Sequence, residues 1–218
     1  MSRIGWVAVA ATIALVGVGV RVAGAVDHEN EQGFKVIFDG KSLDGWKIAE
    51  NPSSFKLQDG ALVAHGPRAH AFYVGDEKPF RNFELKADVM TRKNANGGIF
   101  FHTKYQDRDW PNQGFEAQVN NTFQPDPRKT GSLYNVKDVL NTSPVGDDVW
   151  FTEHVIVQGP KVTIKVEGKT VVEWTDPEGT APGQGLKNRV GEGTFALQAH
   201  DPESVVFYKN IRVKRLPN

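Results

Sequence analysis

The sequence predicts an all-β fold, specifically a sandwich of two antiparallel β-sheets. Between residues 83 and 89 apolar side chains alternate with Glu84, Lys86 and Asp88, the period of a strand with one buried face. Similar runs recur along the chain and end at Gly, Pro, Asn or Asp, whereas helical periodicity is nearly absent after residue 25. These observations, with two tight-turn signals, favour a two-layer β core.

Two hairpins and one closing strand are predicted in this sandwich. Asp59-Gly60 separates the short apolar runs 55–57 and 61–63, and Gly168-Lys169 separates the alternating run 162–167 from 170–174. Residues 205–216 form the last strand. Three connections, 65–82, 104–113 and 121–141, are long for a compact β domain, and such loops often carry function. The third is rich in aromatic residues and proline, so we interpret it as a rim over a sheet face.

The first 25 residues are typical of an export signal. Arg3 gives a positive start, residues 6–20 are apolar, and Ala23-Gly24-Ala25 is a small-x-small motif that predicts cleavage after Ala25. The apolar run is shorter than the roughly 20 residues of a membrane span. We therefore expect a periplasmic or secreted protein in which residues 26–218 form a single β-sandwich domain. Retention of the segment as an anchor, favoured by Arg21, remains the alternative.

Charge and composition restrict the partners. The signal contains two of the 26 basic residues and none of the 26 acidic ones, so the mature chain has a net charge of about −2. Such a balance argues against nucleic acid or an anionic membrane surface as a partner. The chain has no cysteine, which excludes disulfides, thiolate metal sites and a lipidated N-terminal cysteine. Nothing in the sequence indicates an oligomeric state.

Three polar clusters lie within strand-like runs, at residues 98–102, 114–120 and 197–200. Because side chains alternate along a strand, Glu116, Gln118 and Asn120 are expected on one face, and Gln198 is expected to share a face with His200. Burying such groups without partners costs roughly 1–3 kcal/mol each. A sheet face with this composition is therefore predicted to be either solvated or a ligand site.

The residue types suggest roles within that site. We assign His200 as a general base or acid, and Glu116 as a catalytic carboxyl that polarises the ligand or binds a metal. His102 is the third catalytic candidate, as a metal ligand or oxyanion donor. The substrate-binding candidates are Gln118, Asn120, Tyr134 and Gln198. The candidate ligands of a divalent metal ion are His102, Glu116 and His200. No compact metal-binding motif is present, and no other cofactor is predicted.

Three further residues are interpreted as structural. Trp110 and Tyr105 are expected to pack within their loop. His70 has no polar companion on its own strand face, so it is expected to be a surface residue or a satisfied structural one.

The motifs also resemble a known family. Five segments occur in the order typical of exported bacterial proteins of the 3-keto-disaccharide hydrolase family: FDGKSLDGW at 38–46, NGGIFF at 96–101, GFEAQV at 114–119, TGSLY at 130–134, and LQAH at 197–200 followed by KNI at 209–211. Two positions differ from the family pattern. His102 stands where the family often has arginine, and Phe151 follows Trp150 where asparagine is usual.

The resemblance implies a concanavalin A-like, or laminin-G-like, jelly roll and a sugar substrate already oxidised at C3. It also implies 1,2-elimination of a 3-keto-glycoside, followed by hydration of the 3-keto-2-hydroxyglucal. A C3 ketone acidifies the C2 hydrogen, so one base can start the reaction. Two alternatives remain: a non-catalytic lectin-like module, and a conventional retaining glycosidase. The latter needs two carboxylates about 5 Å apart, and the strand of Glu116 carries no second one.

Overall fold

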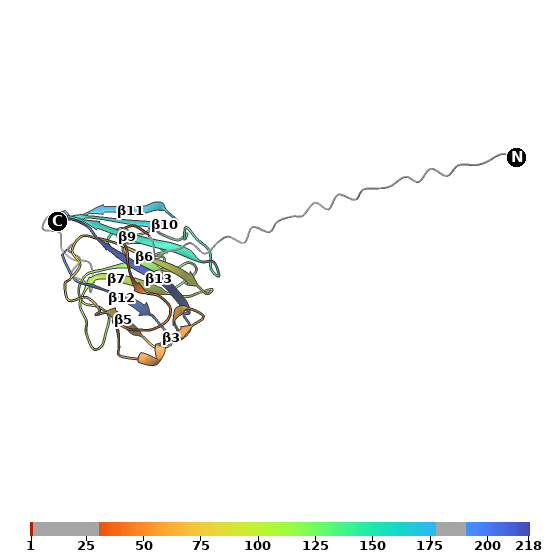
Figure 1. Ribbon diagram of the computed structural model, residues 1–218, viewed down its shortest axis with the longest axis horizontal. Coiled ribbons are helices and arrows are strands. Elements are labelled where there is room, and N and C mark those ends of the chain that lie inside the picture. Colours follow the sequence, from red (N-terminus) through yellow and green to blue (C-terminus); the bar gives the residue numbers. More distant parts are fainter. Residues whose placement is uncertain (2–30, 178–190) are drawn as a thin grey trace.

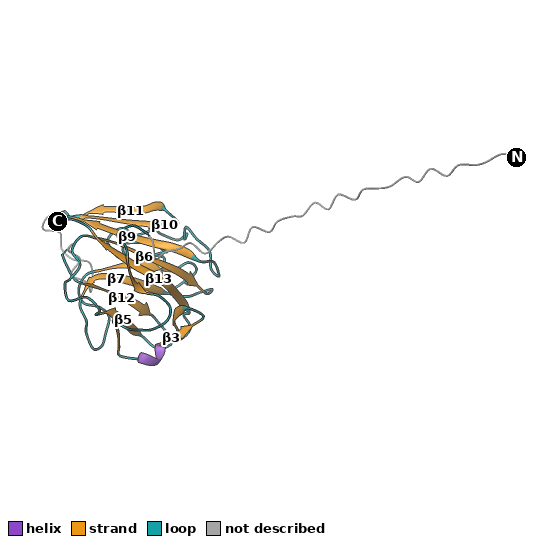
Figure 2. Ribbon diagram, in the orientation of Figure 1, coloured by secondary structure: helices purple, strands orange, loops and turns teal. Residues whose placement is uncertain are grey.

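The computed structural model describes Met1, residues 31–177 and residues 191–218. Apart from Met1, the predicted signal peptide and its cleavage position after Ala25 lie outside the described residues. Nearly all of the described regular structure is β-strand, with one turn of 3-10 helix, η2, at Pro52–Ser54 (Figure 2). No helix among these residues is long and apolar enough to cross a membrane.

Two antiparallel sheets form the predicted sandwich, and in the view of Figure 1 the strands of one sheet partly overlap those of the other. Sheet A has the order β11-β10-β9-β6-β13-β4-β3, with β1 also paired to β13. Its strands are β1 (Lys35–Phe38), β3 (Phe55–Gln58), β4 (Ala61–Ala64), β6 (Phe83–Thr91), β9 (Phe151–Gln158), β10 (Lys161–Val166), β11 (Lys169–Thr175) and β13 (Val206–Arg215). Sheet B has the order β2-β5-β12-β7-β8. Its strands are β2 (Trp46–Ala49), β5 (Ala69–Tyr73), β7 (Gly97–Thr103), β8 (Phe115–Val119) and β12 (Thr194–Ala199).

The predicted hairpins are present, and one turn is shifted by a residue. Asp59 and Gly60 connect β3 to β4 with φ of 50° and 75°, as a two-residue turn with two left-handed positions requires. Between β10 and β11 the turn residues are Glu167 and Gly168, because Val166 pairs with Lys169. The closing strand β13 lies between β6 and β4 and covers most of the predicted range.

Strand β5 was not predicted, since it falls within the expected loop 65–82. Every residue of its sequence AHAFY is buried, so the strand shows no alternation of polar and apolar positions. It pairs with β2 on one side and β12 on the other, which places it inside sheet B. A strand covered on both faces has no period-two signal to detect.

The core lies between the two sheets and is rich in phenylalanine. Phe101 and Phe115 stack with ring centroids 5.3 Å apart, and Phe83 meets Phe195 edge-on at 5.0 Å. Burial of each such ring contributes about 1.5–3 kcal/mol. Three of these rings, Phe101, Phe115 and Phe195, point inward from sheet B, and the residues that alternate with them along the strands point to its outer face. That outer face is where the polar clusters lie.

Candidate active site

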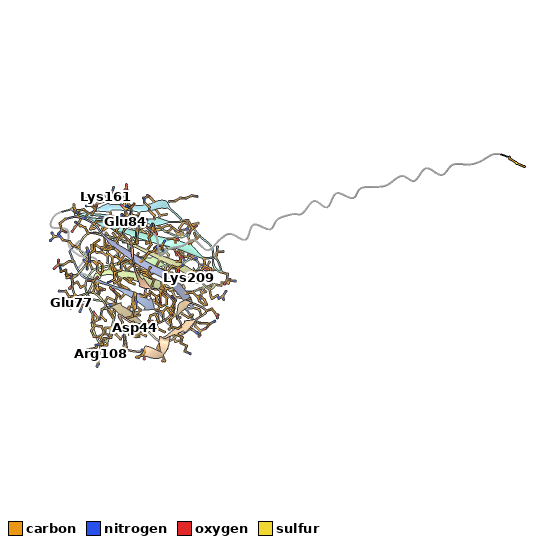
Figure 3. The ribbon with its side chains drawn as sticks, viewed as in Figure 1. Asp44, Glu77, Glu84, Arg108, Lys161 and Lys209 are labelled. Carbon is orange, nitrogen blue, oxygen red and sulfur yellow. The ribbon has the colours of Figure 1, made fainter. Side chains whose placement is uncertain are left out.

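A cavity of about 300 Å³ opens on the outer face of sheet B. Its lining residues are Asn96, Phe100, Trp110, Pro111, Glu116, Gln118, Asp126, Tyr134, Asn135, Gln198 and His200. The strands β7, β8 and β12 form its floor, and loops 104–114 and 120–135 form its walls. In Figure 3, Arg108 of the first loop projects on the side of the molecule opposite Lys161 of sheet A. The cavity volume is at the lower end of the range for small-molecule sites.

Alternation along β8 places Glu116 and Gln118 on the cavity floor. Their neighbours Phe115, Ala117 and Val119 belong to the core between the sheets. Gly98 of β7 pairs with Gln118 and adds no side chain to this face. The Glu116 carboxyl occupies the vacant space, since a Cβ on Gly98 would lie only 2.1 Å from Glu116 Oε1. Glycine at residue 98 therefore allows Glu116 to lean across β7.

Glu116 reaches the next strand in this way. Gln198 Nε2 of β12 donates a hydrogen bond to Glu116 Oε1 at 3.1 Å. Burial raises the pKa of the Glu116 carboxyl to about 8. The hydrogen bond from Gln198 lowers this pKa, and the charge of Asp126 raises it. At neutral pH the carboxyl is therefore mostly protonated and can donate a hydrogen bond. Gln198 Oε1 is buried without a hydrogen-bond partner, which leaves an acceptor for a ligand hydroxyl.

His200 forms part of the cavity wall directly after β12. Its Nδ1 lies 2.7 Å from Asp201 Oδ2, and the imidazole packs against Trp110 at 5.3 Å and Phe123 at 5.6 Å. Burial opposes ionisation of Asp201, but hydrogen bonds from Ser204 and His200 hold its pKa below the usual range. A charged Asp201 fixes the imidazole with Nδ1 as the donor, so that Nε2 can accept a proton from a ligand.

Five predicted site residues are brought together in this cavity: Glu116, Gln118, Tyr134, Gln198 and His200. Tyr134 enters it from loop 120–135, with the Arg128 guanidinium 4.8 Å above its ring. Burial and the nearby Asp126 raise the pKa of the Tyr134 hydroxyl to about 12, so it remains a neutral donor.

The expectation that His102 joins the site is wrong. Its φ is 54°, a left-handed conformation that interrupts the alternation near the end of β7. The imidazole instead packs against Phe83 at 5.5 Å, with Nε2 2.9 Å from Arg81 O, while Gly191 N donates to Nδ1 at 3.1 Å. Burial lowers the pKa of His102 to about 4. It is a neutral structural histidine away from the cavity.

Asn120 is also absent from the cavity lining, contrary to its expected role in substrate binding. Strand β8 ends at Val119, so the alternation that begins at Glu116 does not extend to Asn120. The buried Asn120 amide organises loop 120–135. Its Nδ2 donates to Arg128 O at 2.7 Å and Asp126 O at 3.1 Å, and its Oδ1 accepts from Phe123 N at 2.8 Å.

Sequence reasoning missed several residues at the site. Besides those discussed below, the lining residues that were not predicted are Asn96, Phe100, Pro111 and Asn135. Asp126 lines the cavity from a loop, where no periodicity could indicate it. Trp110, expected to pack internally, also lines the cavity and remains 42% exposed. His70 pairs with Gln198 across β5 and β12, and its ring meets Trp110 edge-on at 5.6 Å. The neighbourhood of His70 depends on strand order, which the sequence does not reveal.

The predicted metal ligands do not form a metal cluster. Within residues 31–177 and 191–218, no group of three or more His, Cys, Asp or Glu side chains is arranged to hold a metal ion. His102 is the candidate that the fold removes, which leaves Glu116 and His200 in the cavity.

Comparison with known proteins identifies the family. This chain is 27% identical in sequence to a 3-keto-disaccharide hydrolase of Bacteroides thetaiotaomicron. The aligned region covers 84% of this chain and 79% of the Bacteroides protein. The fold is similar to a candidate glycosyl hydrolase of Parabacteroides distasonis, with a TM-score of 0.72, 20% identity and coverage of 88% and 98% of the two chains. The carbohydrate recognition domain of Emp47p has a TM-score of 0.53 and 14% identity, with 84% and 95% covered.

These likenesses agree with the lectin-like sandwich described above. The family model for the 3-keto-alpha-glucoside-1,2-lyase-like domain matches residues 33–214, which include every residue of the cavity and both sheets except Arg215, the last residue of β13. The chain belongs to the 3-keto-alpha-glucoside-1,2-lyase-like domain family.

Proposed function

We propose that the protein is an enzyme that cleaves 3-keto-glycosides by 1,2-elimination and then hydrates the resulting 3-keto-2-hydroxyglucal. The observation that carries this proposal is the pairing, in one cavity, of the His200–Asp201 dyad with the buried Glu116 carboxyl. One group is suited to accept a proton and the other to donate a hydrogen bond. A proton acceptor and a hydrogen-bond donor held at fixed positions in one cavity are typical of acid–base catalysis.

The elimination uses both groups. His200 Nε2 removes the hydrogen at C2, which the neighbouring ketone acidifies, and the electron pair forms the C1–C2 double bond. The glycosidic oxygen leaves C1 with the bonding electrons and takes a proton from solvent. Negative charge develops on the C3 oxygen during this step. Protonated Glu116 donates a hydrogen bond to that oxygen, in a buried site where such a bond is stronger than in water. Asp201 stabilises the imidazolium that forms at His200.

Other features of the cavity suit a sugar. Gln198 Oε1 is a buried acceptor without a partner, which a substrate hydroxyl would satisfy. Phe100 and Trp110 provide apolar surface for the face of a pyranose ring, and Gln118 and Asn135 provide amides at its edge. The 3-keto-disaccharide hydrolase activity of the Bacteroides relative supports a disaccharide substrate. We further propose that the protein acts outside the cytoplasm, on the basis of its N-terminal sequence.

A conventional glycosidase is the second candidate function, because Asp126 supplies the second carboxyl that the strand of Glu116 lacks. In that case Glu116 would be the acid and Asp126 the nucleophile or base. A third candidate, a lectin-like module, needs neither the His200–Asp201 dyad nor a protonated carboxyl.

One experiment separates the three functions. The protein is incubated in deuterated water with a 3-keto-glucoside or with the unoxidised parent glucoside, with and without a chelator. Elimination predicts release of the leaving group from the oxidised sugar alone, with deuterium incorporated at C2. Equal release from the parent sugar would identify a glycosidase, and binding without release or exchange would identify a lectin. Loss of activity with the chelator would show that a metal ion is required.

A further inference from the structure

Asp126 is the second carboxyl of the cavity, and the elimination described above does not use it. Its backbone is fixed by a buried cluster behind the wall. Lys129 is 4% exposed, and its Nζ donates to Asp126 O at 3.1 Å and Phe123 O at 2.8 Å. Asn120 Nδ2 donates to the same Asp126 carbonyl at 3.1 Å. These contacts hold the residue at the cavity without occupying its side-chain oxygens.

Arg128 anchors the Asp126 side chain at Oδ1, and the Tyr134 hydroxyl is a further hydrogen-bonding neighbour of this carboxylate. Oδ1 accepts from the Arg128 backbone N–H at 2.9 Å and from Arg128 Nη1 at 3.1 Å. The same guanidinium lies over the Tyr134 ring and brings its Nε within 3.4 Å of Asp138 Oδ2. Arg128 therefore orients Asp126 on the wall formed by loop 120–135, whereas His200 belongs to the end of β12.

The chemistry of the second half-reaction requires a further base. After elimination, His200 holds the proton taken from C2 and cannot accept another from water. Glu116 is a donor in its protonated state and is hydrogen-bonded to Gln198. Among the described residues that line the cavity, Asp126 is the carboxyl that remains.

We propose that Asp126 is the general base of the hydration step, which accepts a proton from the water that adds to C1 of the 3-keto-2-hydroxyglucal. This inference rests on the proposed function. As Asp126 removes the proton, the water oxygen forms a bond to C1 and the electron pair of the C1–C2 double bond moves to C2, conjugated with the C3 ketone. His200 then returns its proton to C2. The proton that Asp126 releases to solvent balances the one that the leaving glycosidic oxygen took up during elimination. The net change over both steps is therefore addition of one water.

The test is Asp126→Asn, with Asp138→Asn as the matched control. Both substitutions remove a carboxylate that contacts Arg128, but Asp138 is not part of the cavity lining. With a 3-keto-glucoside, Asp126→Asn is expected to keep leaving-group release within a few-fold of wild type. It should slow hydration by roughly 10²- to 10⁴-fold, the usual contribution of a general base. The unsaturated ketone, one water lighter than the final sugar, should then accumulate in mass spectra and ultraviolet absorbance. Asp138→Asn should not accumulate it.

The outcomes separate this inference from the proposed function. If wild type releases nothing from the oxidised sugar, the proposed function fails whatever Asp126 does. If wild type completes both steps and Asp126→Asn yields the hydrated sugar without accumulation, corrected for the enzyme-free rate, Asp126 is not the hydration base. Equal loss of both steps at an unchanged Tm would assign Asp126 to the first step and also overturn the inference. If Asp126→Asn does not fold, Asp126→Glu is used instead, because it keeps the carboxylate but displaces it by one methylene group. The inference then requires that this variant slows the hydration step more than the elimination step.

Discussion

Gln198 Nε2 and Glu116 Oε1 are 3.1 Å apart, although β7 lies between their strands. The bond is made above Gly98, because only a residue without a side chain leaves room for the Glu116 carboxyl. The hydrogen bond thus depends on a glycine that leaves space for it, while the Gly98 carbonyl accepts from the Tyr208 hydroxyl at 3.4 Å. It connects the carboxyl of β8 to the strand that leads into His200.

Replacement of Gly98 by alanine should therefore reduce catalysis more than stability. The new Cβ would lie 2.1 Å from Glu116 Oε1, so Glu116 must move and lose its bond to Gln198. We expect kcat to fall by roughly 10²-fold or more, as when a transition-state donor is displaced. Gly146→Ala is the control, since nothing lies within 4 Å of its Cβ position. Kinetics on a 3-keto-glucoside check this, and an unchanged kcat in Gly98→Ala would contradict the placement of Glu116.

Two histidine substitutions should have opposite effects. His200→Ala removes the base next to Asp201, so turnover should fall by roughly 10²- to 10⁴-fold with little change in Tm. His102→Phe removes the partners of Arg81 O and Gly191 N from a buried position, which should cost about 1–3 kcal/mol of stability. The folded His102→Phe protein should keep its kcat. Thermal unfolding with kinetics on both variants tests this, and a large loss of kcat in His102→Phe would return His102 to the site.

The sequence was sufficient to predict the sandwich and most of the cavity floor, because alternation along a strand is a local property. Glu116 and Gln118 are two residues apart on one strand, and the inward neighbours that orient them are plainly apolar. The same rule failed where the backbone departs from ideal strand geometry. His102 has a left-handed φ, and Asn120 lies one residue beyond the end of β8.

Other parts of the site depend on tertiary arrangement. Asp126 reaches the cavity because Lys129 and Asn120 bind the carbonyls of its loop, a set of contacts without a sequence period. His70 lies beside Gln198 because β5 pairs with β12, although the two residues are far apart in the chain. Neither neighbourhood can be derived from spacing.

A second buried carboxyl should make stability depend on pH. Glu153 of β9 is 1% exposed, and this burial raises the pKa of its carboxyl from 4.5 to about 8. The hydrogen bond from the Gly131 backbone amide lowers the pKa, and the charge of Glu116 raises it further. The folded protein therefore retains a proton that the unfolded chain loses above pH 4.5. The contribution of Glu153 to stability is fully present below that pH and is lost as the pH rises to about 8.

Glu153→Gln should remove this dependence. Each pKa unit corresponds to about 1.4 kcal/mol. The free energy of unfolding of the variant, minus that of wild type, should therefore increase by a few kcal/mol from pH 5 to pH 8. Denaturant unfolding at a series of pH values measures the difference. The buried histidines contribute equally to the pH dependence of both proteins, so their contribution cancels when the variant is compared with wild type at each pH. A constant difference across this range would show that Glu153 is ionised in the folded protein at neutral pH.

The pH dependence of turnover should report Glu116 directly. If protonated Glu116 stabilises the developing charge on the C3 oxygen, kcat of wild type should fall as the pH rises through about 8, where the carboxyl loses its proton. Glu116→Gln keeps a hydrogen-bond donor that does not titrate, so this decrease should disappear. Its kcat at pH 7 should lie between wild type and Glu116→Ala, which lacks a donor and should lose roughly 10²- to 10³-fold. The profiles are measured as initial rates of leaving-group release, with the enzyme-free rate subtracted at each pH. Two results would contradict this role: a loss of kcat in Glu116→Gln as large as in Glu116→Ala, or a rise in wild-type kcat through pH 8. Either would show that Glu116 acts as a base in its ionised form. The roles of Glu116 and His200 would then have to be exchanged.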